Sequence, residues 1–134
     1  MRFTAARRNA MLNTNITPLN SGRLRIYSGT RPVDGDTALS GNTLLAELVL
    51  NATFSPSAAS ATLTANAITA DASADATGTA SFVRAFQSDG TTVVGDLSVS
   101  ITGGGGEIQF STLSFVETVA ISLSSFTINQ PIGA

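Results

Sequence analysis

The side chains that could do chemistry in this sequence are almost all carboxylates and arginines. Its 134 residues contain no Cys, His, Lys or Trp, one Tyr and nine acids, and all seven positive charges are arginines. Histidine, cysteine and lysine are the residues most used for proton transfer, covalent catalysis and transition-metal binding. We therefore expect no catalytic, cofactor-binding or metal-binding residues, and a structural role in place of an enzyme.

Three short motifs resemble ligand sites but lack the residues that such sites require. The glycine run at residues 103–106 is followed neither by Lys-Ser/Thr nor by a helix pattern, so a flexible hairpin loop is favoured over a phosphate cradle. Asp34-Gly35-Asp36 resembles the start of a calcium loop, but two later ligand positions are apolar, which favours a turn. For Asp71 and Asp75 we expect a solvated loop, because no surrounding pattern indicates the pocket of a glycosidase.

The charges are divided unevenly along the chain. Six arginines lie within residues 1–31, which contain no acid: Arg2, Arg7, Arg8, Arg23, Arg25 and Arg31. Residues 32–134 contain all nine acids and one arginine, so the formal charges of the two segments are +6 and −8. The chain therefore consists of a basic leader on an acidic body.

Three interpretations of the basic leader compete. Arginines bind nucleic-acid phosphates, but the acidic body would repel the same polyanion, so nucleic acid is disfavoured as a partner. An arm that reaches an acidic surface on a neighbouring subunit, including a second copy of this chain, is favoured because arginine–carboxylate pairs fix geometry as well as adding binding energy. A solvated helix on its own domain remains the alternative. The predicted contact residues are Arg2, Phe3, Arg7, Arg8 and Met11 in the arm and Arg23, Arg25, Tyr27 and Arg31 in the body.

The arm itself is predicted to contain one short helix over residues 3–13. Apolar residues recur there at a spacing compatible with one helical face: Phe3, Ala6, Ala10 and Met11. Pro18 and Gly22 end the helix pattern. We therefore expect an N-terminal arm at residues 1–21, a folded domain at residues 22–130 and a C-terminal tail at residues 131–134.

Alternating apolar and polar residues predict several short strands in the body. The clearest alternation lies at residues 23–27, 80–86 and 97–101, and a nearly all-apolar run at 44–50 predicts a strand covered on both faces. Small side chains that alternate with hydroxyl residues at 59–67 favour another strand, although alanine also suits a helix. Residues 33–42 and 71–78 are expected to be loops.

The turns decide how these strands connect. Asp89-Gly90 is the strongest hairpin signal, and the glycine run at 103–106 predicts a second hairpin that returns through Ile108 and Phe110. In the last strand, at 119–128, the apolar phase slips by one position, which predicts a bulge or bend near Ser124-Ser125. Together these elements predict an all-β fold, an antiparallel β-sandwich of jelly-roll-like form, with an N-terminal helical or extended basic arm.

The sequence shows no sign of secretion or of a membrane. An apolar run does not follow the basic N-terminus, and no stretch approaches the 18 or so apolar residues of a membrane span. We expect a soluble chain with no leader and no membrane partner.

Several stretches resemble small structural proteins of tailed bacteriophages. They are GRLRIYSGTRP at residues 22–32, ALSG at 38–41, LLAEL at 44–48 and ITADASADATGTA at 68–80, followed by Phe82, Arg84 and the Asp89-Gly90 turn. The resemblance covers most of residues 1–128 and includes no catalytic signature. Members of such families are mostly described only as virion structural proteins.

The resemblance implies a virion protein that is assembled in the host cytoplasm. A capsid decoration, or cement, protein would sit on the shell, bind the major capsid protein or other virion subunits through its arm, and form a homo-oligomer, with a trimer favoured. A minor tail, neck or fibre-base component is the second expectation. A carbohydrate-binding module is the rival from another class, for which only Tyr27 could supply the usual Tyr or Trp platform.

Overall fold

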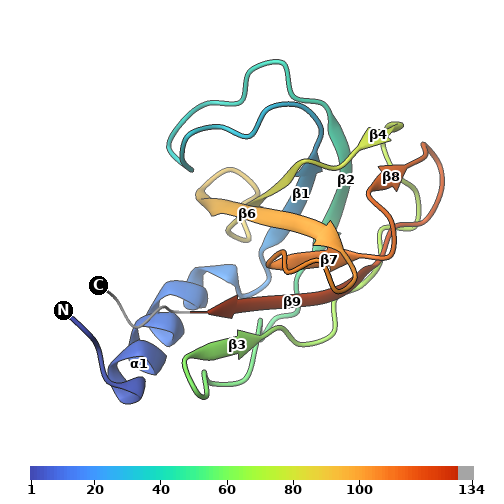
Figure 1. Ribbon diagram of the computed structural model, residues 1–134. Coiled ribbons are helices and arrows are strands. Elements are labelled where there is room, and N and C mark those ends of the chain that lie inside the picture. Colours follow the sequence, from blue (N-terminus) through green and yellow to red (C-terminus); the bar gives the residue numbers. More distant parts are fainter. Residues whose placement is uncertain (130–134) are drawn as a thin grey trace.

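Most of the chain folds into β-strands that follow one N-terminal helix (Figure 1). This computed structural model describes residues 1–129. The elements are helix α1 (Ala5–Ile16), the 3-10 turn η1 (Thr17–Leu19), β1 (Arg23–Tyr27), β2 (Leu44–Val49), β3 (Thr62–Thr64), β4 (Gly78–Thr79), β5 (Phe82–Phe86), β6 (Val93–Ile101), β7 (Ile108–Phe110), β8 (Ser114–Phe115) and β9 (Leu123–Asn129). The fold is therefore β-rich, as the alternation predicts. The predicted tail at 131–134 lies outside the described residues.

The strands form one large mixed sheet. Its seven strands run in the order β2-β1-β5-β6-β7-β9-β3, and β4 pairs with β8 in a separate two-stranded sheet. Every pair in the large sheet is antiparallel except β6 and β7, which are parallel. The prediction of an antiparallel sheet is therefore wrong at this pair, and so is the predicted second hairpin.

The glycine run at residues 103–106 explains why β7 runs parallel to β6 and does not form the predicted hairpin. After Ile101 the chain folds back beside Ser100, where the Gly106 amide donates to Ser100 Oγ at 2.9 Å, and then continues in the direction of β6. Gly103 and Gly105 have φ values of +84° and +87°, in the left-handed region that glycine enters without strain. A hydrophobic pattern predicts that two strands are present, but the direction of the second depends on this local backbone geometry.

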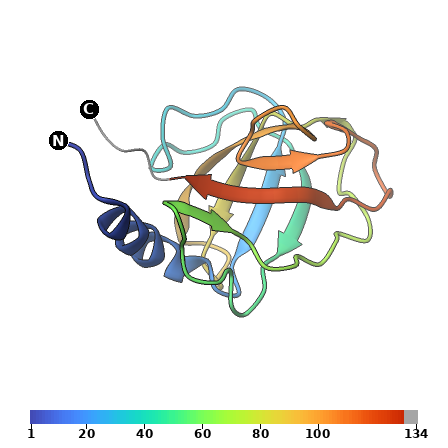
Figure 2. The same cartoon turned by 60° about the horizontal axis from the view of Figure 1, so that its bottom comes forward.

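The sheet is curled so that its two ends approach each other. β7, β9 and β3 cross β1, β2 and β5, and the long strand β6 connects the two groups (Figures 1 and 2). Apolar side chains fill the space between them, among them Leu24, Ile26, Leu48, Phe110 and Phe126. A short segment spans the remaining gap, because the Asp75 amide donates to the Leu45 carbonyl of β2 and Asp71 forms an antiparallel bridge with Ile121, just before β9.

The predicted bulge in the last strand is confirmed. Gln109 pairs with Ser125 while Phe110 pairs with Leu123, so Ser124 is the extra residue on β9. Its hydroxyl donates to the Gln109 carbonyl at 2.9 Å. This extra residue accounts for the slip of the apolar phase, since it lets Leu123 and Phe126 both face the interior.

The strand predicted at 59–67 is formed only at Thr62–Thr64. Ser60 and Ala61 have φ values of 51° and 59°, which turn the chain tightly before β3. The Ala59 and Thr62 backbone groups bond to each other across this turn, and alanine is a poor strand former, so the alternating pattern does not decide the structure here.

The hairpin between β5 and β6 is confirmed at Asp89-Gly90. Asp89 Oδ1 accepts hydrogen bonds from the Thr91 and Thr92 amides, and Asp89 Oδ2 accepts one from the Thr92 hydroxyl. Gly90 has a φ of +71°, which suits the turn.

Asp89 gives this hairpin a dependence on pH. Its hydrogen bonds from Thr92 and Thr91 lower the pKa of the Asp89 carboxyl from 3.8 to about 2. A carboxyl whose pKa is lower in the folded than in the unfolded chain stabilises the fold at pH values above its unfolded pKa. This stabilisation is lost as the pH falls from about 4 to about 2. We expect Asp89→Asn to lower the urea midpoint at pH 6 and to have almost no effect at pH 2. An equal loss at both pH values would contradict this role.

Candidate partner-binding site

Helix α1 is fixed to the body by one face. Thr4 is its N-cap and accepts a hydrogen bond from the Arg7 amide, and η1 follows at its C-terminal end with Pro18 in the first turn. Leu12 and Ile16 are buried, with Leu12 only 2% exposed. The leader is therefore helical over residues 5–16, and its C-terminal half contributes to the hydrophobic core.

The buried face differs from the face that the sequence predicts. Asn9 Oδ1 accepts from the Ala61 amide and Asn13 Oδ1 from the Ala58 amide, both at 2.8 Å. These two asparagines share a helical stripe with Leu12 and Ile16, so half of the docking face is polar. A search for apolar spacing could not find this stripe, although two asparagines four positions apart are a usable signal.

The predicted apolar residues lie instead on the outer side of α1. A shallow hollow there is lined by Phe3, Arg7, Ala10, Met11, Thr14 and Asn15. Arg2 and Arg7 are exposed, while Phe3 and Met11 are half-buried. We call Arg2, Phe3, Arg7 and Met11 the basic face. Four of the five predicted arm residues are thus available to a partner.

Arg8, the fifth arm residue, is placed differently. Its side chain is half-buried, and its Nε is a buried atom without a hydrogen-bond partner. The loss of a hydrogen bond at a buried donor is costly. Arg8 therefore belongs to the packing of α1 more than to its exposed surface.

The predicted body residues Arg23 and Arg25 bind within the chain. Arg23 Nη1 lies 3.0 Å from Glu47 Oε1, and Arg25 Nε lies 2.6 Å from Glu47 Oε2. Arg25 also stacks over the Phe86 ring, 4.5 Å from its centre. The hydrogen bond to Glu47 raises the pKa of Arg25. Both arginines are partly exposed, and they share the single carboxylate of Glu47, which offsets one of their two charges.

Tyr27 and Arg31 complete the predicted body set. Tyr27 is 7% exposed and stacks on Phe82 at 5.5 Å, and burial raises the pKa of its hydroxyl. Arg31 is exposed and donates from Nη2 to the Asp96 carbonyl at 3.0 Å. Of the four body residues, Tyr27 is thus the one that the fold withdraws from the surface.

A buried ion pair was missed by the sequence analysis. Arg84 Nε lies 2.7 Å from Asp96 Oδ1, and Arg84 Nη2 donates to Asp96 Oδ2 at 2.9 Å and to the Asp34 carbonyl at 3.2 Å. The two side chains are 5% and 3% exposed. Strand pairing places Glu47, Arg25, Arg84 and Asp96 side by side across β2, β1, β5 and β6. The one arginine outside the leader therefore has a structural role.

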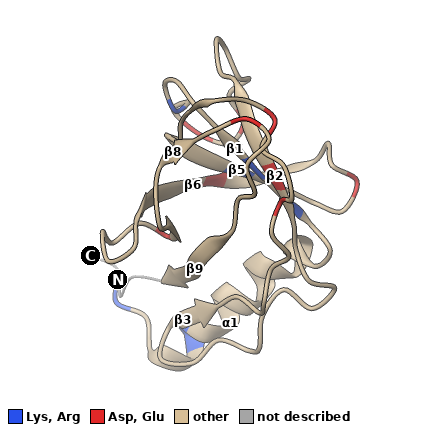
Figure 3. Cartoon of the chain, turned by 90° about the vertical axis from the view of Figure 1, so that its right-hand side faces the viewer, with Lys and Arg blue, Asp and Glu red and all other residues tan. Residues whose placement is uncertain are grey.

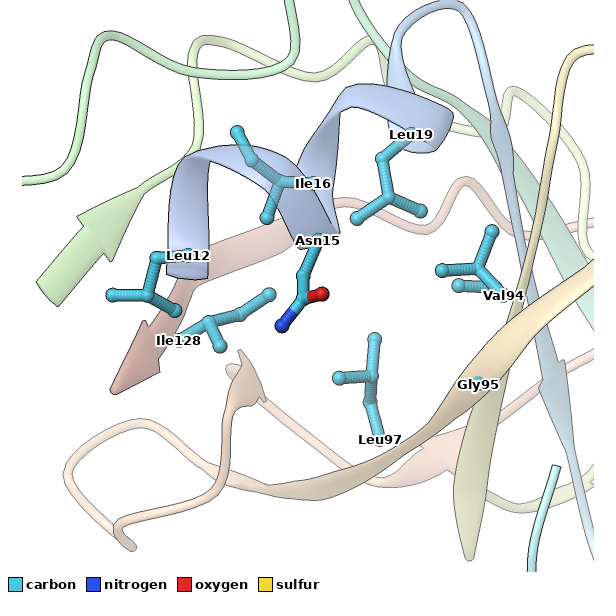
Figure 4. A pocket seen from close by; sticks show the side chains of 9 residues that line it. Leu12, Asn15, Ile16, Leu19, Val94, Gly95, Leu97 and Ile128 are labelled. Atoms are coloured by element: carbon cyan, nitrogen blue, oxygen red, sulfur yellow. The ribbon is translucent and has the colours of Figure 1, made fainter. Parts of the chain in front are cut away.

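A small apolar cleft remains where α1 meets β6 and β9 (Figure 4). It is lined mainly by Leu12, Ile16, Leu19, Val94, Leu97 and Ile128, and the Asn15 side chain points into it. None of its lining residues among residues 1–129 is titratable.

Basic residues lie on the elements at the helix end of the molecule. In Figure 3 the N-terminal segment and α1 carry basic residues, and no acidic residue lies on α1 or β3. Within residues 1–129, no group of three or more His, Cys, Asp or Glu is arranged to hold a metal ion. In the same residues, α1 is too short and too polar to cross a bilayer.

Comparison with known proteins yields no relative for this chain. No protein-family model, no curated protein and no solved structure matches it. Its function must therefore be argued from its own residues.

Proposed function

We propose that this chain is a non-catalytic structural subunit of a tailed-phage virion, and that it binds the capsid shell as a decoration protein. The resemblance of residues 22–32 and 68–80 to virion structural proteins suggests the setting. The basic face of α1 is the observation that carries the role. A minor tail, neck or fibre-base subunit would use the same surface.

The basic face suits attachment because its helix is already held in place. Leu12, Asn9 and Asn13 fix the inner side of α1, so the outer side is ordered before any partner arrives. A preformed surface loses less conformational entropy on binding. Phe3 and Met11 provide apolar contact area, and Arg2 and Arg7 favour an acidic surface on the major capsid protein or another virion subunit.

Repetition would strengthen this attachment. Many weak contacts on a symmetric shell add up through avidity, without any catalytic group. The proposal includes self-association of the decoration subunits, for which the resemblance favours a trimer. Localisation to the virion follows from the same proposal.

A role in sugar binding is disfavoured by the aromatic residues. Within residues 1–129, every Tyr and Phe except Phe3 is buried, including Tyr27. Sugar platforms need exposed rings. A glycan array tests this rival class directly.

Charge reversal on the basic face should weaken attachment to the particle. We expect Arg2→Glu with Arg7→Glu to lower the affinity for shells stripped of this protein by at least about tenfold, because two attractive charges become repulsive. The measurement is co-sedimentation of purified protein with such shells. Ser40→Glu with Ser88→Glu is the control, since both residues are exposed, lie outside α1 and are not among the predicted contact residues. Unchanged binding of the double variant would remove the basic face from the proposal.

The copy number decides between the two virion roles. Quantitative mass spectrometry of purified particles should give a ratio to the major shell protein within a few-fold of one to one, because the shell lattice offers that many equivalent sites. A few copies per particle would place the chain in the tail or neck.

A further inference from the structure

A second exposed surface lies where the chain pairs around residues 74–77 and 116–119. The Ala74 amide donates to the Val119 carbonyl, the Thr118 amide to the Ala74 carbonyl, and the Glu117 amide to Thr77 Oγ1. These bonds bring Asp75 close to Glu117, and both are exposed. We call Asp75, Val116, Glu117 and Val119 the acidic end.

Two large apolar side chains are exposed within the acidic end. Val116 is 50% exposed and Val119 is 51% exposed. Thr118 has a φ of 71°, and the Val119 amide donates to the Val116 carbonyl, so a tight turn holds this conformation. A β-branched residue in the left-handed region is strained. The strain is retained at a turn that keeps both valines in solvent.

The acidic end matches the basic face in composition. Asp75 and Glu117 are opposite in charge to Arg2 and Arg7, and Val116 and Val119 are apolar partners for Phe3 and Met11. Within residues 1–129, these hydrogen bonds engage the backbone amides of Asp75 and Glu117 and not their carboxylates. Complementary charges of this kind set partner and orientation.

The two surfaces lie on opposite sides of the body. In Figure 1, α1 is at the lower left, whereas β8 and the chain that leads from it to β9 are at the right. Figure 3 views the molecule from that right-hand side, with α1 at the bottom. One copy therefore cannot bring its own basic face to its own acidic end.

We propose that the basic face of one copy binds the acidic end of the next, head to tail. This inference rests on the proposed function. The head-to-tail contact and the shell contact use the same basic face, so a copy whose basic face holds another copy cannot hold the shell by that face, and the two contacts compete. Such a contact is heterologous, so it forms a ring if the rotation closes and an open chain if it does not. A closed ring of three copies would be a trimer of this kind, and an open chain would grow with concentration.

Paired charge reversals test the contact. The first variant carries Arg2→Glu and Arg7→Glu, and the second carries Asp75→Arg and Glu117→Arg. Each has like charges on both surfaces, so each alone should associate at least about tenfold more weakly than the unchanged protein. An equimolar mixture restores opposite charges at every contact of an alternating chain, and it should recover the large species. Ser40→Glu and Asp36→Arg are the controls, because both residues are exposed and lie in the loop between β1 and β2.

The measurement is sedimentation velocity at several concentrations, in low and high salt, with circular dichroism to show that each variant is folded. Recovery in the mixture, and loss of large species near 1 M salt, would support the contact. The inference is overturned if the unchanged protein stays monomeric or if the second variant associates like the unchanged protein. The same variants tested on stripped shells separate the two proposals. Monomers that still bind shells through Arg7 would leave the proposed function standing without the head-to-tail contact.

Discussion

Replacing Asp96 with alanine is expected to lower the free energy of unfolding by about 3–5 kcal/mol, because the change leaves the Arg84 guanidinium buried without its carboxylate partner. Arg84 is 5% exposed at its side chain and would keep only the Asp34 carbonyl as an acceptor. The hydrogen bond with Asp96 raises the pKa of Arg84, so the guanidinium is charged at any working pH. Urea unfolding at pH 7 measures the loss.

Two further variants test whether the stability lost by Asp96→Ala is due to the unpaired charge of Arg84. Glu47→Ala removes the partner of Arg23 and Arg25, which are about a quarter to a third exposed at their side chains, and should cost about 1 kcal/mol or less. Arg84→Met with Asp96→Leu removes both charges and should recover most of the stability lost by Asp96→Ala. If the double variant is as unstable as the single one, packing around Asp96 and not the ion pair is responsible.

The ion pair also holds the loop between β1 and β2. Arg84 Nη2 donates to the Asp34 carbonyl, and Arg31 Nη2 donates to the Asp96 carbonyl. The Asn42 side chain closes the base of this loop by donating to the Ser28 and Thr30 carbonyls. Loss of Asp96 should therefore loosen the loop as well as β5 and β6, while α1 and its basic face remain docked through separate contacts.

The sequence could predict the strands and the first hairpin but not the Arg84–Asp96 pair. Strand positions follow from alternation, and the hairpin follows from Asp89-Gly90. From Phe86 opposite Val93, a regular register would place Gly95 opposite Arg84. A one-residue shift between Ala85 and Phe86 brings Asp96 there instead. Such a shift reverses which face a side chain occupies, and the apolar pattern around Val93 does not reveal it.

The sequence predicts which residues form the candidate site, but it predicts the surface position of only some of them. The charge division along the chain identifies the leader, and Arg2, Phe3, Arg7 and Met11 lie on an exposed surface. The burial of Tyr27 could not be foreseen, because it depends on Phe82 of the neighbouring strand, which stacks on the Tyr27 ring. The acidic end was missed because Asp75 and Glu117 are 42 positions apart in the sequence and meet only through the backbone pairing around Ala74.

Gly106→Ala is expected to destabilise the protein by about 1–3 kcal/mol, because the parallel strand pair depends on a close approach of the chain to itself. A Cβ at Gly106 would lie 2.7 Å from the Ser100 amide nitrogen and 2.8 Å from the Val99 carbonyl carbon. Both atoms belong to the backbone of β6, so they cannot move aside as a side chain could. The same displacement would weaken the hydrogen bond from the Gly106 amide to Ser100 Oγ. The free energy of unfolding in urea measures the effect.

Gly95→Ala is the matched control for this prediction, because a Cβ at Gly95 meets nothing within 4 Å. It should change the stability by no more than about 0.5 kcal/mol. A flexible hairpin loop at 103–106, as the sequence predicts, would tolerate alanine at Gly106 just as well. Equal stability of the two variants would therefore argue for that hairpin and against the parallel pairing of Val99 with Ile108. A clear difference would show that glycine at 106 sets the direction of β7, and with it the curl that brings β7 and β9 across β1 and β5.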